Sequence, residues 1–203
     1  MTGCKWNAGI LVHSGDFEKS SECERMLRRM PLYMVVILHN IRSLHNVGSI
    51  FRTADAVGVE KLYLCGITPS PLDRFGVVRS DVAKVALGAE KTVVWEQVST
   101  TARCITMLRK QGFAVVALEQ DPRAIPYDAY GTNPSPAKAG TPFRKGRIKP
   151  IALVLGAEVE GISPAVLKNC DTIIEIPMRG KKESLNVAVA FGVAAFRLRD
   201  DRE

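Results

Sequence analysis

The chain has 203 residues, of which 46% are hydrophobic and 24% are charged. This composition is typical of a soluble globular domain and excludes wholesale disorder or a collagen-like repeat. There is no uninterrupted apolar stretch of about 18 residues, so a membrane span is not expected. The net charge of +7 favours a polyanionic partner such as a nucleic acid, although a moderate basic excess is also common in proteins that bind none.

The first residues contain no long apolar run followed by a small-residue cleavage site, so secretion is not signalled. The five cysteines are widely spaced, odd in number and never arranged as Cys-x-x-Cys. They indicate free thiols in a reducing compartment, the cytoplasm, and neither a disulfide framework nor a metal site.

Residues 1–30 are polar and form an N-terminal extension, with a short helix expected over Asp16–Arg29. From residue 31 to residue 203, apolar strand patterns alternate with helical patterns in a single domain. The expected strands are Leu32–Leu38, Lys61–Cys65, Thr92–Trp95, Ala114–Leu118, Ile151–Leu155 and Thr172–Ile176. The expected helices are Asn46–Val57, Ser80–Leu87, Thr100–Gln111, Pro164–Lys168 and Ser184–Leu198. This alternation predicts an α/β fold, a mostly parallel sheet with helices on both faces.

The first chemically informative motif runs from His39 to Asp55, where a buried strand ends and a helix begins. Asn46 is a plausible N-cap of that helix. Arg52 falls among small neighbours that would let a bulky anion approach. Because open α/β sheets bind ligands at the carboxyl ends of their strands, Asn46 and Arg52 are candidate site residues. The alternative, a cap plus a surface arginine, stays open on this segment alone.

A long loop is expected over residues 131–149, which contain three prolines, three glycines and five basic side chains with no acid. Such a loop is either a solvated insertion or a contact for phosphates. Its candidate RNA contacts are Arg144, Lys145 and Arg147.

The second motif extends from Leu153 to Pro164. A buried strand ends at Gly156, and Gly156 and Gly161 would permit tight backbone beside a ligand. Glu158 lies in that loop, placed to meet a cation or a hydroxyl, although an acidic loop between glycines is common. The chain contains neither Gly-x-Gly-x-x-Gly nor a Walker-type Gly-Lys-Ser/Thr, which disfavours a dinucleotide oxidoreductase or an NTPase.

The third motif runs from Ile174 to Ala190. Pro177 ends the strand because it lacks an amide donor, and Ser184 is expected to cap the terminal helix. That helix is apolar on nearly every face, so one side should pack on the sheet and another on a second protein surface. We therefore expect a homodimer through the C-terminal helix region. Arg179, Lys181 and Lys182 are candidate RNA-backbone contacts or ordinary surface charges.

Together the three motifs resemble the SpoU (TrmH-like) branch of the SPOUT RNA methyltransferases. The matching residues are Asn46-x-Gly48-x-x-x-Arg52-Thr53, Leu155-Gly156-x-Glu158-x-x-Gly161, and Ile176-Pro177-Met178 followed by Ser184-Leu185-Asn186-Val187. The resemblance covers residues 32–198. It departs at Ala157, where asparagine is frequent, and at Ala188, where serine is frequent. It implies a C-terminal deep trefoil knot, which general topology rules would not predict.

The resemblance also implies methyl transfer from S-adenosylmethionine to a ribose 2′-hydroxyl of tRNA or rRNA. Family members of similar size that lack a large RNA-binding domain include tRNA enzymes, which favours tRNA. The implied catalytic residues are Arg52, Asn46, Glu158, Ser184 and Asn186. The implied cofactor-binding residues are Leu155, Gly156, Ile176, Met178, Leu185 and Leu118.

Two other functions remain open at this point: a knotted enzyme that methylates a base, and a catalytically silent RNA-binding or ribosome-assembly factor. The family's arginine is often described as a general base, but a charged guanidinium has no acceptor and a pKa above about 12. We instead expect Arg52 to bind the phosphate beside the target ribose and to stabilise the developing alkoxide. The proton would then pass to that phosphate, to water or to Glu158.

Overall fold

The computed structural model describes residues 5–7, 10–12, 34–131 and 150–200. The chain divides into two compact units, Met1–Pro31 and Leu32–Glu203. The described part of the first unit is an antiparallel pair of short strands, β1 (Lys5–Asn7) and β2 (Ile10–Val12). The helix expected over Asp16–Arg29 and the basic loop at 132–149 lie outside the described residues.

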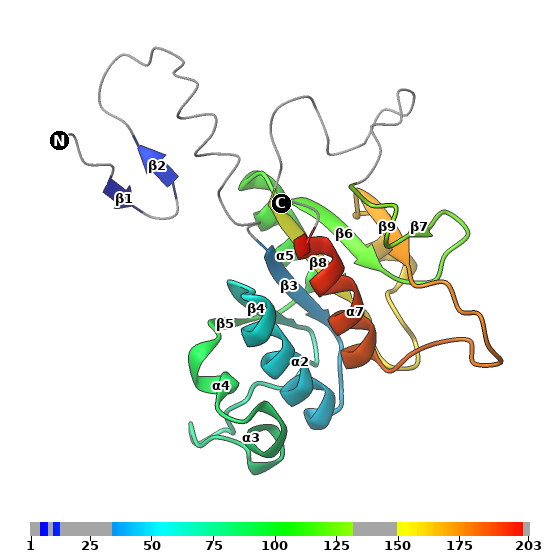
Figure 1. Ribbon diagram of the computed structural model, residues 1–203. Coiled ribbons are helices and arrows are strands. Elements are labelled where there is room, and N and C mark those ends of the chain that lie inside the picture. Colours follow the sequence, from blue (N-terminus) through cyan, green and yellow to red (C-terminus); the bar gives the residue numbers. More distant parts are fainter. Residues whose placement is uncertain (1–4, 8–9, 13–33, 132–149, 201–203) are drawn as a thin grey trace. The chain divides into compact units, whose positions relative to one another are not determined.

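The second unit alternates strands and helices along the chain (Figure 1). Its strands are β3 (Met34–His39), β4 (Lys61–Cys65), β5 (Trp95–Val98), β6 (Ala114–Leu118), β7 (Ile125–Pro126), β8 (Ile151–Leu155) and β9 (Thr172–Glu175). Its helices are α2 (Leu44–Val57), α3 (Ser80–Ala86), α4 (Ala89–Thr92), α5 (Thr101–Lys110), α6 (Pro164–Leu167) and α7 (Val187–Asp200).

The seven strands form one sheet in the order β5-β4-β3-β8-β6-β9-β7, and every pairing in it is parallel. β8 lies in the middle, with Val154 opposite Ile37 of β3 and opposite Ala117 of β6. All five residues of β8 are buried, as a central parallel strand covered on both faces requires. The carboxyl ends of β3, β8, β6 and β9 therefore meet at one edge of the sheet.

Helices cover both faces of this sheet, which confirms the predicted α/β class. Successive side chains of a strand point to opposite faces, so β3 contributes to two cores. Val36 and Leu38 pack with α2 and α7, whereas Val35 and Ile37 pack with α5 and α6. Figure 1 shows α2 and α7 side by side on the first face.

The edge near β5 differs from the sequence-based expectation. Residues 92–95 were expected to be a strand because Thr92, Val93 and Val94 are β-branched. Instead α4 ends at Thr92, whose hydroxyl donates to Asp55 Oδ1 of α2 at 2.8 Å. The strand begins only at Trp95 and carries the polar residues of an exposed edge, so an apolar run could not identify it.

α7 is an apolar helix with one buried side and one exposed side. The buried side packs in the core and consists of Ala188, Phe191, Ala194, Ala195 and Leu198. The other side carries Val189, Val193 and Phe196, which are 53%, 38% and 50% exposed. The expectation that the sheet can cover only one side of this helix is thus confirmed. No helix within the described ranges has the length and apolar character needed to cross a membrane.

Candidate active site

The candidate site lies where the turns after β3 and β8 meet the start of α7. In the parallel ladder, Leu38 of β3 is opposite Leu155 of β8, so the two turns leave the sheet side by side. The first turn leads into α2 and the second forms a short loop in which Ala157 and Gly161 pair their backbones.

α2 begins two residues before the predicted start. Its N-cap is Ser43, whose Oγ accepts the amide of Asn46 at 3.3 Å. The expectation that Asn46 caps the helix is therefore wrong: serine is an equally good cap, and it lies three residues earlier. As a consequence Asn46 sits in the first turn of α2, buried, with its side chain free to make contacts outside the helix.

The carboxylate of Glu158 joins the β8 loop to the start of α2. Its Oε1 accepts the amide of Ser43 at 3.1 Å and the side-chain Nδ2 of Asn46 at 2.9 Å, and its Oε2 accepts the amide of Arg42 at 3.1 Å. Hydrogen bonds to a charged acceptor are stronger than neutral ones. Glu158 was predicted to meet a cation or a hydroxyl, but in this structure its carboxylate accepts three hydrogen bonds from the protein itself.

These donors set the protonation state of Glu158. Partial burial opposes ionisation, but the hydrogen bonds from Asn46, Arg42 and Ser43 outweigh it and hold the pKa of Glu158 below its ordinary value. A carboxylate with a depressed pKa and occupied lone pairs is a weak proton acceptor at neutral pH.

Asn186 joins the third motif to the other two. Its Nδ2 donates to Asn46 Oδ1 at 3.0 Å, and its Oδ1 accepts the amide of Ala188 at 2.9 Å. Its carbonyl accepts the amide of Ala190 at 2.8 Å, so Asn186 is the capping residue of α7. The prediction that Ser184 caps this helix is wrong. Ser184 is exposed, and its hydroxyl has no hydrogen-bond partner within the described part of the chain.

We call this chain of contacts, Arg42, Ser43, Asn46, Glu158 and Asn186, the carboxylate–amide network. Beside it lies a hollow of about 460 Å³ between α2 and the start of α7. Its lining residues are His45, Asn46, Ser49, Thr53, Asn186, Ala188, Val189 and Gly192. The three sequence motifs therefore converge on one place, which no single motif could establish.

The basic candidates lie at its margins. Arg52 is exposed on α2, one turn after Gly48, and makes no ion pair or hydrogen bond within the described residues. Arg179, Lys181 and Lys182 are exposed in the segment between β9 and α7. Arg144, Lys145 and Arg147 lie outside the described residues.

Four of the predicted cofactor residues, Leu118, Leu155, Gly156 and Ile176, lie at the carboxyl ends of strands in the sheet. Leu118 and Leu155 end neighbouring strands, with Leu118 opposite Leu155 in the ladder. Ile176 directly follows β9, whereas Met178 and Leu185 lie in the segment between β9 and α7.

The backbone at this edge fits a ligand held by main-chain groups. A Cβ on Gly156 would lie 2.4 Å from the carbonyl carbon of Gly161 and 2.6 Å from the amide of Ile162, so only glycine allows this close approach. The amides of Ile176, Met178 and Leu185 have no backbone partner within the described residues. They are available to the polar edge of a bound group.

Glu119 and Gln120, which directly follow β6, also belong to this site. Glu119 Oε2 accepts the amide of Ile162 at 2.7 Å, and a Cβ on Gly161 would lie 2.5 Å from the same oxygen. Gln120 Nε2 donates to the carbonyl of Glu183. Glu119 therefore holds the β8 loop, and Gln120 holds the β9–α7 segment; the only sequence signal was their position directly after a buried strand.

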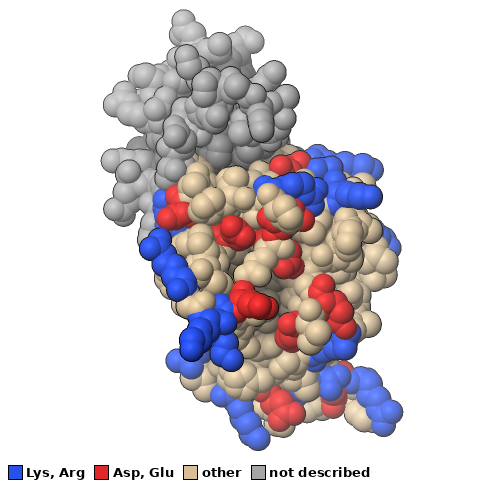
Figure 2. All heavy atoms as spheres, turned by 90° about the vertical axis from the view of Figure 1, so that its right-hand side faces the viewer, with Lys and Arg blue, Asp and Glu red and all other residues tan. Residues whose placement is uncertain are grey.

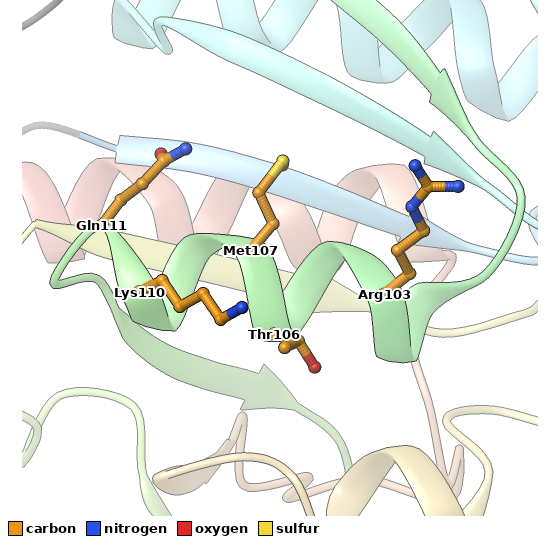
Figure 3. Close-up of a pocket in the computed structure, with 5 residues that line it drawn as sticks. All are labelled: Arg103, Thr106, Met107, Lys110 and Gln111. Atoms are coloured by element: carbon orange, nitrogen blue, oxygen red, sulfur yellow. The ribbon is translucent and has the colours of Figure 1, made fainter.

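Three further observations concern the molecular surface and metal binding. Figure 2 shows the face that carries β7 and β9, where acidic side chains surround a central hollow and basic ones lie farther out, so this face is not uniformly basic. A further hollow of about 490 Å³ is lined by four side chains of α5 and by Gln111, which caps the end of that helix (Figure 3), on the sheet face opposite α2. Among the described residues, no group of three or more His, Cys, Asp or Glu side chains could hold a metal ion.

Comparison with known proteins gives a consistent result. Residues 33–196 match the SpoU rRNA Methylase family. The chain is 36% identical over 163 residues to the 23S rRNA (guanosine-2'-O-)-methyltransferase RlmB of Ralstonia nicotianae, covering 80% of this chain and 57% of that protein. It is 30% identical over 197 residues to RlmB of Nitrosomonas europaea, covering 97% of this chain and 67% of that protein. The chain thus spans about three-fifths to two-thirds of these relatives.

Solved structures give the same picture. The AdoMet-bound rRNA methyltransferase from Sinorhizobium meliloti aligns with a TM-score of 0.68 and 25% identity over 85% of this chain and 59% of that one. The A. aeolicus TrmH/SpoU tRNA modifying enzyme aligns with a TM-score of 0.66 and 26% identity over 89% of this chain and 83% of that one.

Proposed function

The chain belongs to the SpoU rRNA methylase family, and from this premise we propose that it methylates a ribose 2′-hydroxyl of RNA, using S-adenosylmethionine as methyl donor. The observation that carries the proposal is the carboxylate–amide network. In it, Asn46, Glu158 and Asn186 come from three distant segments and are joined by hydrogen bonds beside the carboxyl edge of the sheet.

S-adenosylmethionine supplies an electrophilic sulfonium methyl group, so the protein mainly has to align the donor with the ribose oxygen and to promote loss of a proton. Proximity and orientation can contribute about 7–11 kcal/mol in favourable cases. We assign the donor to the backbone around Leu155, Gly156, Ile176, Met178 and Leu185, with Leu118 at the adjoining strand end. The close approach of Gly156 to Gly161 and the available amides after β9 support this assignment.

Arg52 is proposed to bind the phosphate beside the target ribose and to stabilise the developing alkoxide. Its exposure on α2 and its lack of a described partner leave the guanidinium accessible to RNA. A guanidinium binds a phosphate with two parallel hydrogen bonds, which a lysine cannot reproduce.

Glu158 is proposed to position Asn46 and the start of α2, and not to accept the proton. Its three donors and depressed pKa support this assignment. The proton then passes to the adjacent phosphate or to water. Asn186 is a positioning residue in the same sense, whereas Ser184 is proposed to contact a reactant directly because it is exposed two residues before Asn186.

Ribosomal RNA is the substrate class we propose, because curated relatives carry names of 23S rRNA methyltransferases. This differs from the preference for tRNA that chain length suggested; one structural neighbour is named as a tRNA modifying enzyme, so tRNA is the second substrate to test. Arg179, Lys181 and Lys182 are proposed to contact the phosphate backbone of the RNA. Free thiols at Cys65, Cys104 and Cys170 support the cytoplasm as the compartment.

Two features of architecture belong to this proposal. The first is a C-terminal trefoil knot, supported by the insertion of β8 between β3 and β6 and by membership of the family. The second is a homodimer through α7, supported by the exposed apolar stripe of Val189, Val193 and Phe196. Light scattering at micromolar concentration should give the mass of two chains, and a monomer would contradict the dimer.

The function is tested by mapping methylated nucleotides in total RNA from cells with and without the protein. A ribose methyl group protects the adjacent linkage from alkali, so an alkali-resistant dinucleotide should disappear with the gene. Loss of a base-methylated nucleoside would identify the base methyltransferase instead. If calorimetry detects no binding of S-adenosylmethionine, the silent RNA-binding factor is favoured.

A further inference from the structure

An aromatic side chain is presented to solvent on the segment between β4 and α3. Phe75 is 74% exposed, although large apolar side chains are usually covered. The guanidinium carbon of Arg74 lies 4.7 Å from the centroid of the Phe75 ring. This arrangement covers the ring with a cation and is favourable in itself.

The backbone around Phe75 is fixed before any partner arrives. Asp73 Oδ1 accepts the amides of Phe75 and Val77 at 2.8 and 2.9 Å, and the amide of Asp73 donates to the carbonyl of Val77 at 2.8 Å. Gly76 has φ of 78°, which glycine adopts without strain. Leu72 and Val78 pair across the base of this turn. Residues 71–79 therefore form a short hairpin with Phe75 at its tip, which we call the Phe75 hairpin.

The segment that leads from β4 into the hairpin is anchored beside the candidate active site. The amide of Ile67 donates to Asn40 Oδ1 at 3.2 Å, and Thr68 Oγ1 accepts the amide of Ile41 at 3.1 Å and donates to the carbonyl of Leu38 at 3.0 Å. Ile41 directly precedes Arg42 of the carboxylate–amide network. Residues 67 and 68, which precede the hairpin, and the network therefore contact the same turn after β3.

The helix that follows the hairpin packs against the helix that carries Arg52. A Cβ on Gly48 would lie 2.8 Å from the carbonyl of Val82 in α3, so the two helices are in close contact there. Arg52 lies one helical turn from Gly48, on a neighbouring part of the same surface. Arg52 and the hairpin are therefore carried by neighbouring elements, α2 and the segment that enters α3.

We propose that Phe75 stacks on an unpaired base of the RNA substrate near the methylated ribose, with Arg74 holding the other face of the ring; this inference rests on the proposed function. Protein recognition of single-stranded RNA uses aromatic faces and arginine planes in this way. Asp73 Oδ1 accepts backbone amides of the hairpin, and Arg79 Nε donates to the carbonyl of Leu72 at 3.2 Å. These two charged side chains therefore stabilise the conformation of the hairpin. The Phe75 hairpin is a specificity element for the substrate and takes no part in the chemistry.

The test measures binding of a labelled 12-residue oligo(rA) by fluorescence anisotropy, in the single-stranded form and as a duplex with its complement. Phe75→Ala should weaken single-strand binding about tenfold, which is about 1.4 kcal/mol, and leave duplex binding unchanged because paired bases cannot stack on the ring. Phe75→Tyr should restore binding to within about twofold. The slope of log Kd against log salt should stay the same in Phe75→Ala, because no charge is removed.

Val94→Ala is the matched control, since Val94 is also an exposed apolar residue, at 59%, but lies outside the hairpin. Equal binding by Phe75→Ala and Val94→Ala would overturn the proposal. A change in the oligomeric mass of Phe75→Ala with unchanged RNA binding would also overturn it and assign the hairpin to a protein contact.

A second measurement separates this inference from the proposed function. In methylation of ribosomal RNA, Phe75→Ala should raise KM about tenfold and leave kcat unchanged. If no variant methylates RNA but single-strand binding still depends on Phe75, the proposed function fails and the stacking contact stands. If methylation proceeds with the same KM in Phe75→Ala, the stacking contact fails and the proposed function stands.

Discussion

The two halves of the candidate site are built in different ways. The carboxylate–amide network joins Arg42, Ser43, Asn46, Glu158 and Asn186 through side-chain hydrogen bonds between segments more than a hundred residues apart. The segment from Ile176 to Leu185 is mostly exposed, and its described side-chain contact to the rest of the domain is the bond from Gln120 to the carbonyl of Glu183.

This difference teaches which parts of the site are ordered before a ligand binds. The network pairs both ends of its one buried side chain, the amide of Asn46, with Glu158 and Asn186, so its geometry does not depend on substrate. The β9–α7 segment offers backbone amides without backbone partners, so a bound donor would complete its hydrogen bonding. We therefore expect substitutions in the network to reduce kcat and substitutions around the β9–α7 segment to raise KM for the donor.

The largest effect is expected at Arg52, which adds the electrostatic contact that the network alone lacks. Arg52→Ala should lower kcat/KM by about 10²–10³-fold, and Arg52→Lys should lose most of the rate because lysine cannot bind phosphate with two hydrogen bonds. Steady-state methylation of RNA measures both. Arg103→Lys, an exposed arginine on α5, is the control. Near-normal turnover by Arg52→Lys would refute the phosphate contact.

A methyl group at Gly156 should damage the backbone that both halves share. Its Cβ would meet the backbone of Gly161 and Ile162 at 2.4 and 2.6 Å, so the β8 loop must shift. We expect Gly156→Ala to lose about 1–3 kcal/mol of stability and at least tenfold in donor affinity. Denaturant unfolding and calorimetry measure these losses. Gly180→Ala is the matched control, because nothing lies within 4 Å of its Cβ; equal losses in the two variants would contradict the steric argument.

Glu158→Gln should reduce kcat by about tenfold and stability by about 1 kcal/mol, since the neutral amide accepts weaker hydrogen bonds and presents an NH₂ group to backbone donors. The pKa of Glu158 is lowered in the folded protein, so its stabilisation is present above the unfolded value of about 4.3 and is lost as pH falls through the lower folded pKa.

Urea unfolding of the wild type and of Glu158→Gln at pH 7, 5 and 3 tests this. The difference in the free energy of unfolding should shrink at the lowest pH. Glu160→Gln, in the same loop, is the control, because it removes only a surface ion pair with Arg42, in which the two side chains are 56% and 61% exposed. A difference that persists unchanged at pH 3 would show that the charge of Glu158 does not stabilise the network.

The smallest effect is expected at Gln120, whose side chain donates to the carbonyl of Glu183 in the segment between β9 and α7. Gln120→Ala should raise KM for S-adenosylmethionine about threefold with little change in kcat, since an exposed hydrogen bond contributes about 0.5–1.5 kcal/mol. Gln97→Ala, on the exposed edge strand, serves as the control. A fall in kcat with constant KM would contradict the proposal that the β9–α7 segment affects donor binding and the carboxylate–amide network affects kcat.

Much of the fold could be predicted because local patterns and tertiary structure agree. The strands Lys61–Cys65, Ala114–Leu118 and Ile151–Leu155 have the predicted bounds, since buried parallel strands are continuous apolar runs. The ends of helices were harder to predict. Ser43 and Asn46 are both good caps, and so are Ser184 and Asn186. Ser43 caps α2 while Asn46 bonds to the distant Glu158, and Asn186 caps α7 while it donates to the distant Asn46.

The same limit applies to the site. The motifs identified Asn46, Glu158 and Asn186 as neighbours, but the sequence could not show that three donors already occupy the Glu158 carboxylate. Glu119 was missed because its role depends on Ile162, forty-three residues later, and on a glycine at position 161 that leaves room for its carboxylate. Long-range hydrogen bonds of this kind leave no periodic trace in the sequence.

The central position of β8 has a consequence for synthesis of the chain. β3 and β6 emerge from the ribosome before Ile151–Leu155, and both must wait for that strand to supply their shared neighbour. Until then a nascent chain exposes two unpaired apolar strand edges, which are sites for aggregation. Truncated products that end before residue 151 should therefore precipitate, and the folding of this domain should be slow and should follow the synthesis of Ile151–Leu155.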